Sequence, residues 1–170
     1  FNKCGESGYV NVIDSKFAIM RNNTFNFTEI ESSCGAFHIT KCGNITITEC
    51  NFIQMKASGI ILYDPDTAAT EDDFLIIEQC SFSECEGVCC IIKIIDDSSE
   101  SVTINDCSFS KCKPGSDQSI ALQTNAAMVS ILDNNFNDCG NDEENVFIIN
   151  YKGDQNKQRY SSDSLYNQTL

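Results

Sequence analysis

The chain repeats one short pattern around a phenylalanine, and this repeat limits its fold more than any other feature. Each copy reads apolar, any, apolar, two polar or mixed residues, Cys or Asn, any, Phe, two variable residues, and Cys or Met. Clear copies begin at Ile45, Leu75, Val102 and Val129. The anchoring phenylalanines recur at nearly regular intervals and are predicted to form a core ladder of Phe1, Phe27, Phe52, Phe82, Phe109 and Phe136. Such a fixed repeat is typical of a solenoid or a propeller, whose repeats bury their apolar faces against one another.

Within each repeat the apolar residues alternate with a period of two, and β-branched residues and phenylalanine predominate. This pattern is typical of β-strands. Two breaks in the alternation, at Thr48 and Glu49 and again at Ile53 and Gln54, indicate corners where the chain bends. A further strand follows each polar linker, as in residues 36–40 and 60–64. Each coil is therefore predicted to contain three short strands.

A coil of about 27 residues with three strands favours a right-handed parallel β-helix of about six coils, in which strands one coil apart pair at about 4.8 Å. The other repeat folds fit less well, because a propeller blade needs four antiparallel strands over about 40 residues and a left-handed hexapeptide helix needs a six-residue period. The handedness follows from the general bias of parallel crossovers. Residues 1–150 are assigned to the β-helix, and residues 151–170 to a polar C-terminal arm or linker.

Charge excludes one class of partner. The chain carries 11 Lys and Arg against 25 Asp and Glu, a formal net charge of -14, so it would repel a phosphate backbone and no nucleic-acid partner is expected. Its apolar runs are shorter than the roughly 20 residues of a membrane-spanning helix, so no membrane span is expected either.

Sequons and cysteines together favour an extracellular location, either secreted or at the cell surface. Sequons for N-glycosylation occur at Asn22, Asn26, Asn44 and Asn167, and the chain contains 11 cysteines. Both features suit an oxidising compartment. Because the cysteine count is odd, at least one thiol stays free, pairs with another chain, or lacks its partner in this segment.

The cysteines recur two residues before and three residues after the repeat phenylalanine, which predicts two inward ladders. Stacked equivalents lie within the range of disulfide geometry, so Cys80 with Cys107 and Cys112 with Cys139 are disulfide candidates. Packing of reduced thiols is favoured over a continuous disulfide ladder, because Phe25, Ile30 and Met55 are aligned at the same positions and a buried thiol packs as a small hydrophobe. No metal, cofactor or cysteine nucleophile is predicted, because His38 is the only histidine and paired CxxC motifs are absent.

Carboxylates supply the one enzymatic alternative. Asp64 and Asp96 are aligned at the ends of equivalent strands, with Asp66 and Asp97 nearby. Carboxylates about 5 Å apart could bind calcium or act as the pair of a retaining glycosidase. The simpler interpretation is a solvated corner in which Asp supports the turn.

The run from Ser32 to Phe52 resembles the GGA(I/L/V) and FxxN repeats of chlamydial polymorphic outer membrane proteins. It is more similar to the FxxC-bearing β-helix surface proteins of protists such as trichomonads. FxxC is kept at Phe1, Phe82, Phe109 and Phe136. The resemblance covers about residues 1–150 and implies a surface-exposed or secreted β-helix, often adhesive, without catalytic residues.

The expected function is therefore a non-enzymatic extracellular structural or adhesive protein. The alternative is a polysaccharide lyase or glycoside hydrolase that uses Asp64 and Asp96. Uncapped ends predict either a longer β-helix or end-to-end self-association as a filament subunit, in which Cys4 could bridge to Cys139 of a neighbour. A glycan or a host surface is the other partner class considered.

Overall fold

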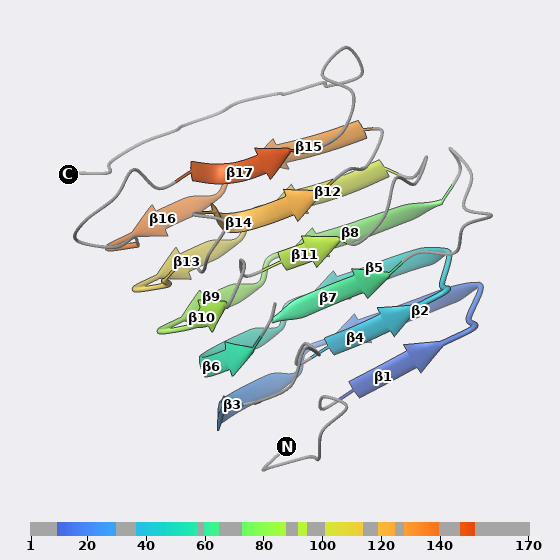
Figure 1. Ribbon diagram of the computed structural model, residues 1–170, viewed down its shortest axis with the longest axis horizontal. Helices are drawn as coiled ribbons and strands as arrows, with labels where there is room; N and C mark the ends of the chain where they lie inside the picture. The colour runs from blue at the N-terminus through green and yellow to red at the C-terminus, as the bar shows by residue number, and fades with distance from the viewer. Residues whose placement is uncertain are drawn as a thin grey trace.

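The strands of the structure pair in parallel and form three sheets that run along one axis (Figure 1). The structure is a computed structural model, and it describes residues 10–29, 37–57, 60–64, 73–87, 92–94, 101–113, 119–124, 128–139 and 147–151. The secondary structure of these residues is all β. Beyond Tyr151, the predicted C-terminal arm lies outside the described residues.

Each sheet is built from equivalent strands of successive coils, and in sheet C one coil contributes two short strands, β9 and β10. Sheet A contains β1 (Val10–Ile13), β4 (Phe37–Thr40), β7 (Ile61–Asp64), β11 (Ile92–Ile94), β14 (Ser119–Thr124) and β17 (Phe147–Tyr151). Sheet B contains β2 (Phe17–Arg21), β5 (Asn44–Thr48), β8 (Phe74–Glu78), β12 (Ser101–Asn105) and β15 (Met128–Leu132). Sheet C contains β3 (Thr24–Glu29), β6 (Asn51–Ala57), β9 (Ser81–Ser83), β10 (Glu86–Gly87), β13 (Ser108–Ser110) and β16 (Asn135–Asn137). This arrangement confirms the predicted all-β class with parallel strands in stacked sheets, and it is consistent with a solenoid.

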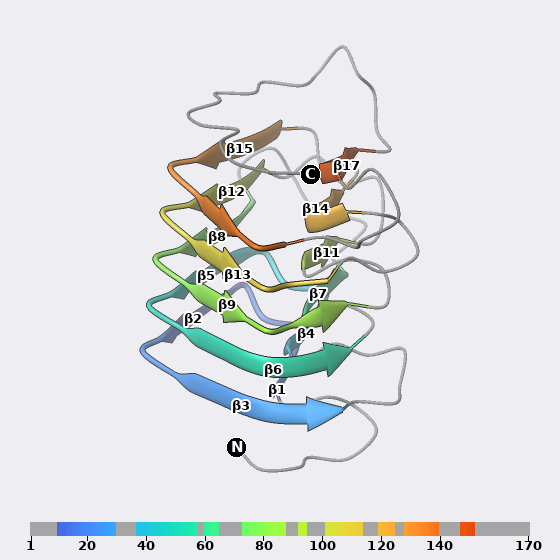
Figure 2. The same cartoon turned by 90° about the vertical axis from the view of Figure 1, so that its left-hand side faces the viewer.

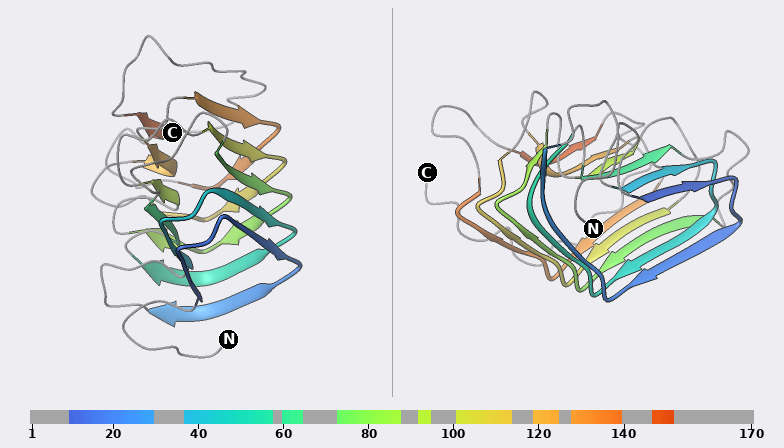
Figure 3. Two further views of the ribbon diagram at one scale, coloured as in Figure 1. Left: turned by 90° about the vertical axis from the view of Figure 1, so that its right-hand side faces the viewer. Right: turned by 90° about the horizontal axis from the view of Figure 1, so that it is seen from below.

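Register is held by pairing between equivalent positions of neighbouring coils. Phe17 pairs with Asn44 and Ile45 pairs with Leu75, in each case one coil further along the chain. The alternation seen in the sequence sets which side chains are buried: Ile45 and Ile47 of β5 are 1% exposed, whereas the neighbouring Asn44, Thr46 and Thr48 are half-buried. Seen from below, successive coils repeat the same path side by side, and their corners form a row (Figure 3, right).

The core contains a continuous stack of phenylalanine rings on sheet C, the sheet that faces the viewer in Figure 2. The ring centroids of Phe52, Phe82, Phe109 and Phe136 are 4.8 Å apart from one to the next, and the rings are almost parallel. This spacing equals that of the strands, about 4.8 Å, because each ring belongs to the same position of its coil. Offset stacking of this kind adds about 0.5–1.5 kcal/mol per pair to the burial energy.

The first described coil corrects the predicted ladder. Phe25, not Phe27, pairs with Phe52, and its ring centroid lies 5.4 Å from that of Phe52 in a stacked arrangement. The prediction of Phe27 was wrong because both phenylalanines alternate in the same phase, so the period alone does not separate them. Phe1 lies outside the described residues.

The corners are built from residues in the left-handed backbone region. Glu49, Gln79, Asp106 and Asp133 follow sheet B strands, and each has a φ between 50° and 55°. This conformation costs a non-glycine residue roughly 1–2 kcal/mol. Part of this cost is offset by hydrogen bonding, because the corner N–H donates to a carbonyl of the next coil, as from Glu49 to Glu78 at 3.1 Å. The predicted corner positions Glu49 and Gln54 both adopt this conformation.

We expect Phe82→Ala to lower the free energy of unfolding by about 3–5 kcal/mol, because it removes a buried ring from the middle of the stack. Ser83→Ala, on the outward face of the same strand, is the matched control and should change it by less than about 0.5 kcal/mol. Urea unfolding followed by circular dichroism measures both. Equal midpoints for the two variants would contradict the inward stack.

Candidate functional site

The corner between sheets B and C carries the first cysteine ladder. Its inward position is occupied by Asn23, Cys50, Cys80, Cys107 and Asn134 in successive coils. The sequence alignment placed Phe25 in this ladder, and the register shows that Asn23 takes this position instead. The ladder therefore has an asparagine in its first and last described members, which packing of apolar side chains alone does not explain.

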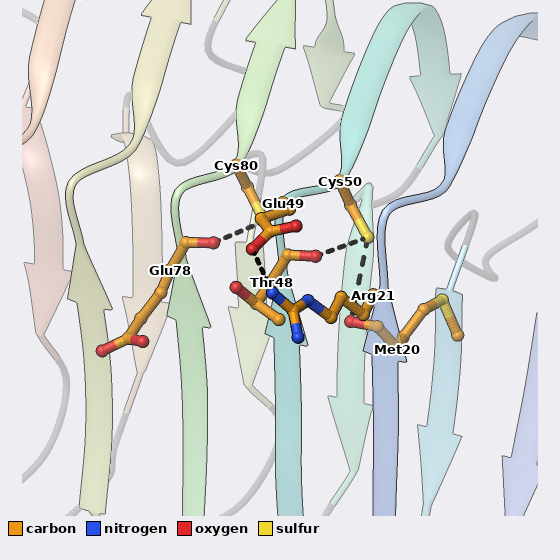
Figure 4. Close-up of polar contacts among 7 residues, drawn as sticks. All are labelled: Met20, Arg21, Thr48, Glu49, Cys50, Glu78 and Cys80. Carbon is orange, nitrogen blue, oxygen red and sulfur yellow. Dashed lines mark hydrogen bonds and ion pairs between the residues drawn. The ribbon is translucent and has the colours of Figure 1, made fainter.

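Each thiol of this ladder joins two coils through hydrogen bonds, as Figure 4 shows for Cys50. The Cys50 Sγ donates to the Thr48 carbonyl at 3.3 Å in its own coil and to the Met20 carbonyl at 3.9 Å in the preceding coil. Cys80 repeats the arrangement with Glu78 at 3.2 Å and Ile47 at 3.6 Å. The shared requirement at this position is therefore a small group that can hydrogen-bond to the corner carbonyls.

Asn134 performs the same task with an amide. It is only 7% exposed, its Oδ1 accepts a hydrogen bond from the Cys107 N–H at 2.8 Å, and its Nδ2 donates to the Ile104 carbonyl at 2.9 Å. In the first coil, the Asn23 Nδ2 donates to the Arg21 carbonyl at 2.8 Å, two residues earlier, as the cysteines do. The motif Asn-Thr-Phe at Asn23 matches Asn-Asn-Phe at Asn134, and this match was the sequence signal for Asn23.

The second ladder lies three residues after the stacked phenylalanines and contains Met55, Cys85, Cys112 and Cys139. The Cys112 Sγ donates to the Phe82 carbonyl at 3.4 Å, and the Cys139 Sγ donates to the Phe109 carbonyl at 3.4 Å. The Cys112 N–H in turn donates to the Cys139 Sγ at 3.4 Å. Thr28, not Ile30, is the register partner of Met55, which corrects the aligned position in the first coil.

The stacked thiols change one another's acidity. Hydrogen bonding with Cys107, together with burial, raises the pKa of Cys80 to about 12. At Cys112 the hydrogen bond with Cys139 acts to lower the pKa, but the hydrogen bond with Cys85 and burial raise it to about 12. Hydrogen bonding with a stacked thiol and burial also raise the pKa of Cys50 and of Cys139.

The pKa values of two other thiols are lowered instead. Hydrogen bonding with Cys80 lowers the pKa of Cys107, and hydrogen bonding with Cys112 lowers the pKa of Cys85. In each ladder, the thiol whose pKa is lowered is buried. The geometry suits packing and inter-coil hydrogen bonding better than attack on a substrate, because a reactive thiol needs an accessible and electropositive setting.

The described cysteines are all free thiols, including the disulfide candidates Cys80, Cys107, Cys112 and Cys139. The remaining candidate, Cys4, lies outside the described residues. A disulfide in either ladder stays a prediction, which the spacing of stacked coils permits.

The carboxylates of the enzymatic alternative are only partly described. Asp64 ends β7, is half-buried, and pairs with Thr40. Asp96, Asp66 and Asp97 lie outside the described residues. Within the described part of the chain, no group of three or more His, Cys, Asp or Glu side chains is arranged to hold a metal ion.

Three of the four sequon asparagines are described. Asn22 is an exposed corner residue with a φ of 58°, and Asn26 is exposed on the outer face of β3. Asn44 begins β5 on the outer face of sheet B, and its Oδ1 is buried without a hydrogen-bond partner. Asn167 lies outside the described residues.

No family model matches the chain, and comparison with curated proteins and with solved structures gives no match. Among the described residues, none forms a helix that is long and apolar enough to cross a membrane.

We expect Asn134→Ala to destabilise the chain by about 1–3 kcal/mol, because it leaves the buried Cys107 N–H without its side-chain acceptor and removes the hydrogen bond from Asn134 to the Ile104 carbonyl. Asn134→Cys should recover most of the loss, since a thiol accepts the equivalent N–H in the second ladder. Thermal and urea unfolding of the two variants under reducing conditions measures the difference. If Asn134→Cys and Asn134→Ala lowered the free energy of unfolding equally, the proposal that asparagine and cysteine share a hydrogen-bonding role at this position would be wrong.

Stability should fall as the pH rises above about 9. The thiols of Cys80 and Cys112 stay protonated in the folded chain because their pKa is raised to about 12, whereas unfolded thiols ionise near about 8.5. Above that pH the unfolded state binds fewer protons, so stability decreases with pH. Urea midpoints at pH 7 and pH 10 measure this, and the double variant Cys80→Ala with Cys112→Ala should show a smaller decrease. An equal decrease in both proteins would exclude these thiols as the cause.

Proposed function

We propose that the chain is a right-handed parallel β-helix, with about six coils of about 27 residues each, that serves as a non-enzymatic extracellular structural or adhesive protein. The observation that carries this proposal is the unbroken axial stack of Phe25, Phe52, Phe82, Phe109 and Phe136. A core built from identical positions gives an elongated scaffold whose outer faces repeat with the same period.

The outer face of sheet C supports a structural or adhesive role. One outward column reads Asn51, Ser81, Ser108 and Asn135, so hydroxyl and amide groups recur once per coil. Within it, the Ser81 Oγ donates to the Asn51 Oδ1 at 2.6 Å. A flat and regular surface of this kind suits contact with another extended surface. The exposed positions of Asn22 and Asn26 support glycosylation there, and hence the extracellular location.

Open strand edges support axial continuation, by further coils of the same chain or by a second copy. Within the described residues, β2 pairs only with β5, and β15 pairs only with β12. A strand edge with unpaired N–H and C=O groups is a template for another strand. End-to-end self-association would therefore extend sheet B and build a filament, because such a contact does not close.

The carbohydrate-active alternative would use Asp64 and Asp96. It is the weaker proposal because an aspartate at the end of a strand is explained more simply as support for the turn at a solvated corner.

Blocking the β2 edge tests self-association. The Asn22 N–H donates to the Thr48 carbonyl and the Asn44 N–H donates to the Lys16 carbonyl, so by strand alternation the Ile19 N–H points away from β5. Ile19→Pro therefore removes an edge donor while the internal ladder stays intact, and it should shorten the assemblies seen by electron microscopy and sedimentation. Ile19→Thr keeps the N–H and is the matched control.

A native chain that sediments as a monomer at high concentration would contradict self-association and favour continuation within a longer chain. Equal shortening by proline and threonine would show that the side chain of Ile19, not its edge N–H, drives assembly.

A further inference from the structure

The sequon at Asn44 lies in the most apolar surroundings on the outer surface of sheet B. Asn44 and Thr46 are two residues apart on β5, so both point outward on the same face. Phe17 on β2 pairs with Asn44, and Ile19 pairs with Thr46. On the other side Ile76 of β8 pairs with Thr46, and Phe74 begins the same strand. The sequon is therefore bordered by apolar side chains on both neighbouring strands.

These flanking side chains are costly to leave in water. Phe17 is 67% exposed and Ile19 is 70% exposed, and with Ile13 they are the exposed large hydrophobic residues of the described chain. Each Å² of apolar surface removed from water stabilises by about 25 cal/mol. A contiguous exposed apolar area usually marks a surface that something covers.

The backbone holds Asn44 in a fixed position. The Asn44 N–H donates to the Lys16 carbonyl at 3.0 Å, and the preceding Gly43 N–H donates to the Ser15 carbonyl at 3.1 Å. From the core side, the buried Tyr63 hydroxyl donates to the Cys42 carbonyl at 2.7 Å. Gly43 has no room for a side chain, since a Cβ would lie 2.9 Å from the Lys16 carbonyl oxygen.

One side-chain atom of Asn44 lacks a hydrogen-bond partner. The Oδ1 atom is buried and has no hydrogen-bond partner, which usually costs about 1–3 kcal/mol. A buried polar atom without a hydrogen-bond partner is rare in folded proteins, so it calls for an explanation. A sugar attached to Nδ2 would place hydroxyl and acetamido groups beside this edge of the strand.

We propose that Asn44 carries an N-linked glycan whose first sugars lie over Phe17, Ile19, Phe74 and Ile76 and shield this face from association. In the transfer, the Asn44 Nδ2 attacks C1 of the first sugar of a lipid-linked oligosaccharide diphosphate. The N–C1 bond forms, the C1–O bond to phosphate breaks, the lipid diphosphate leaves, and the amide proton passes to a base. The sugar carbon–hydrogen faces then pack on the apolar side chains while the hydroxyls remain in water. This inference rests on the proposed extracellular location.

Asn22 provides the internal comparison. It is an exposed corner residue next to the ion pair between Arg21 and Glu49, whose charged atoms lie 2.7 Å apart. A glycan at Asn22 would leave the face around Asn44 uncovered. Substitutions at the two sequons therefore distinguish two effects. Either substitution removes a glycan, but only the loss of the Asn44 glycan is expected to expose the apolar face.

The test is secretion of the full chain from a eukaryotic cell line, with glycopeptide mass spectrometry and binding of a hydrophobic dye. We expect a glycan at Asn44, and Asn44→Gln should lose that glycan and increase dye fluorescence and self-association. Thr46→Val removes the sequon while keeping Asn44 and should behave in the same way. Asn22→Gln is the matched control and should leave dye binding unchanged. Adding Phe17→Ser and Ile19→Thr to Asn44→Gln should return dye binding to the original level.

An unmodified Asn44 in a chain that carries glycans at Asn22 or Asn26 overturns this inference and leaves the extracellular proposal standing. An occupied Asn44 whose loss leaves dye binding unchanged overturns the shielding role. A chain that is retained in the cell, or secreted without a glycan at any sequon, contradicts the extracellular glycoprotein proposal as well.

Discussion

Pairing between equivalent positions of successive coils is the constraint on which the structure depends. Because Phe17 pairs with Asn44 and Ile45 with Leu75, each side chain lies above the residue that has the same role in the next coil. The phenylalanine stack and both cysteine ladders follow from this register. A shift of one residue would turn every inward side chain of a strand toward solvent.

The same register places complementary polar and charged side chains together at one corner. Along one corner, Glu84 lies between Gln54, which donates a hydrogen bond to it at 2.8 Å, and Lys111, whose Nζ lies 3.9 Å from its carboxylate. Nearby, Lys56 and Glu86 form an ion pair at 3.4 Å. Exposed pairs of this kind contribute only about 0–1 kcal/mol each. These pairs therefore add little to stability, and they depend on the register that brings their partners together.

The cysteine ladders show that a buried thiol can serve as a hydrogen-bonding group as well as a small hydrophobe. The described cysteines are free thiols, and Cys50 shows their role as small groups that hydrogen-bond to carbonyls of two coils. Asn134 makes the equivalent contacts with an amide. The alignment treated the position as apolar because it included Phe25. With Asn23 in place of Phe25, the sequence already contains the polar alternative.

The sequence alone determined the strands, the corners and the parallel pairing, because these follow from local alternation and from a repeat visible in four segments. It also located the inward positions of Phe52, Phe82, Phe109 and Phe136. Only the tertiary structure decided between Phe25 and Phe27, since two phenylalanines in phase satisfy the same local pattern and pairing with β6 selects one. Only the tertiary structure placed Phe17 and Ile19 beside the sequon at Asn44, because a neighbour across a sheet is a whole coil away along the chain and its identity depends on register.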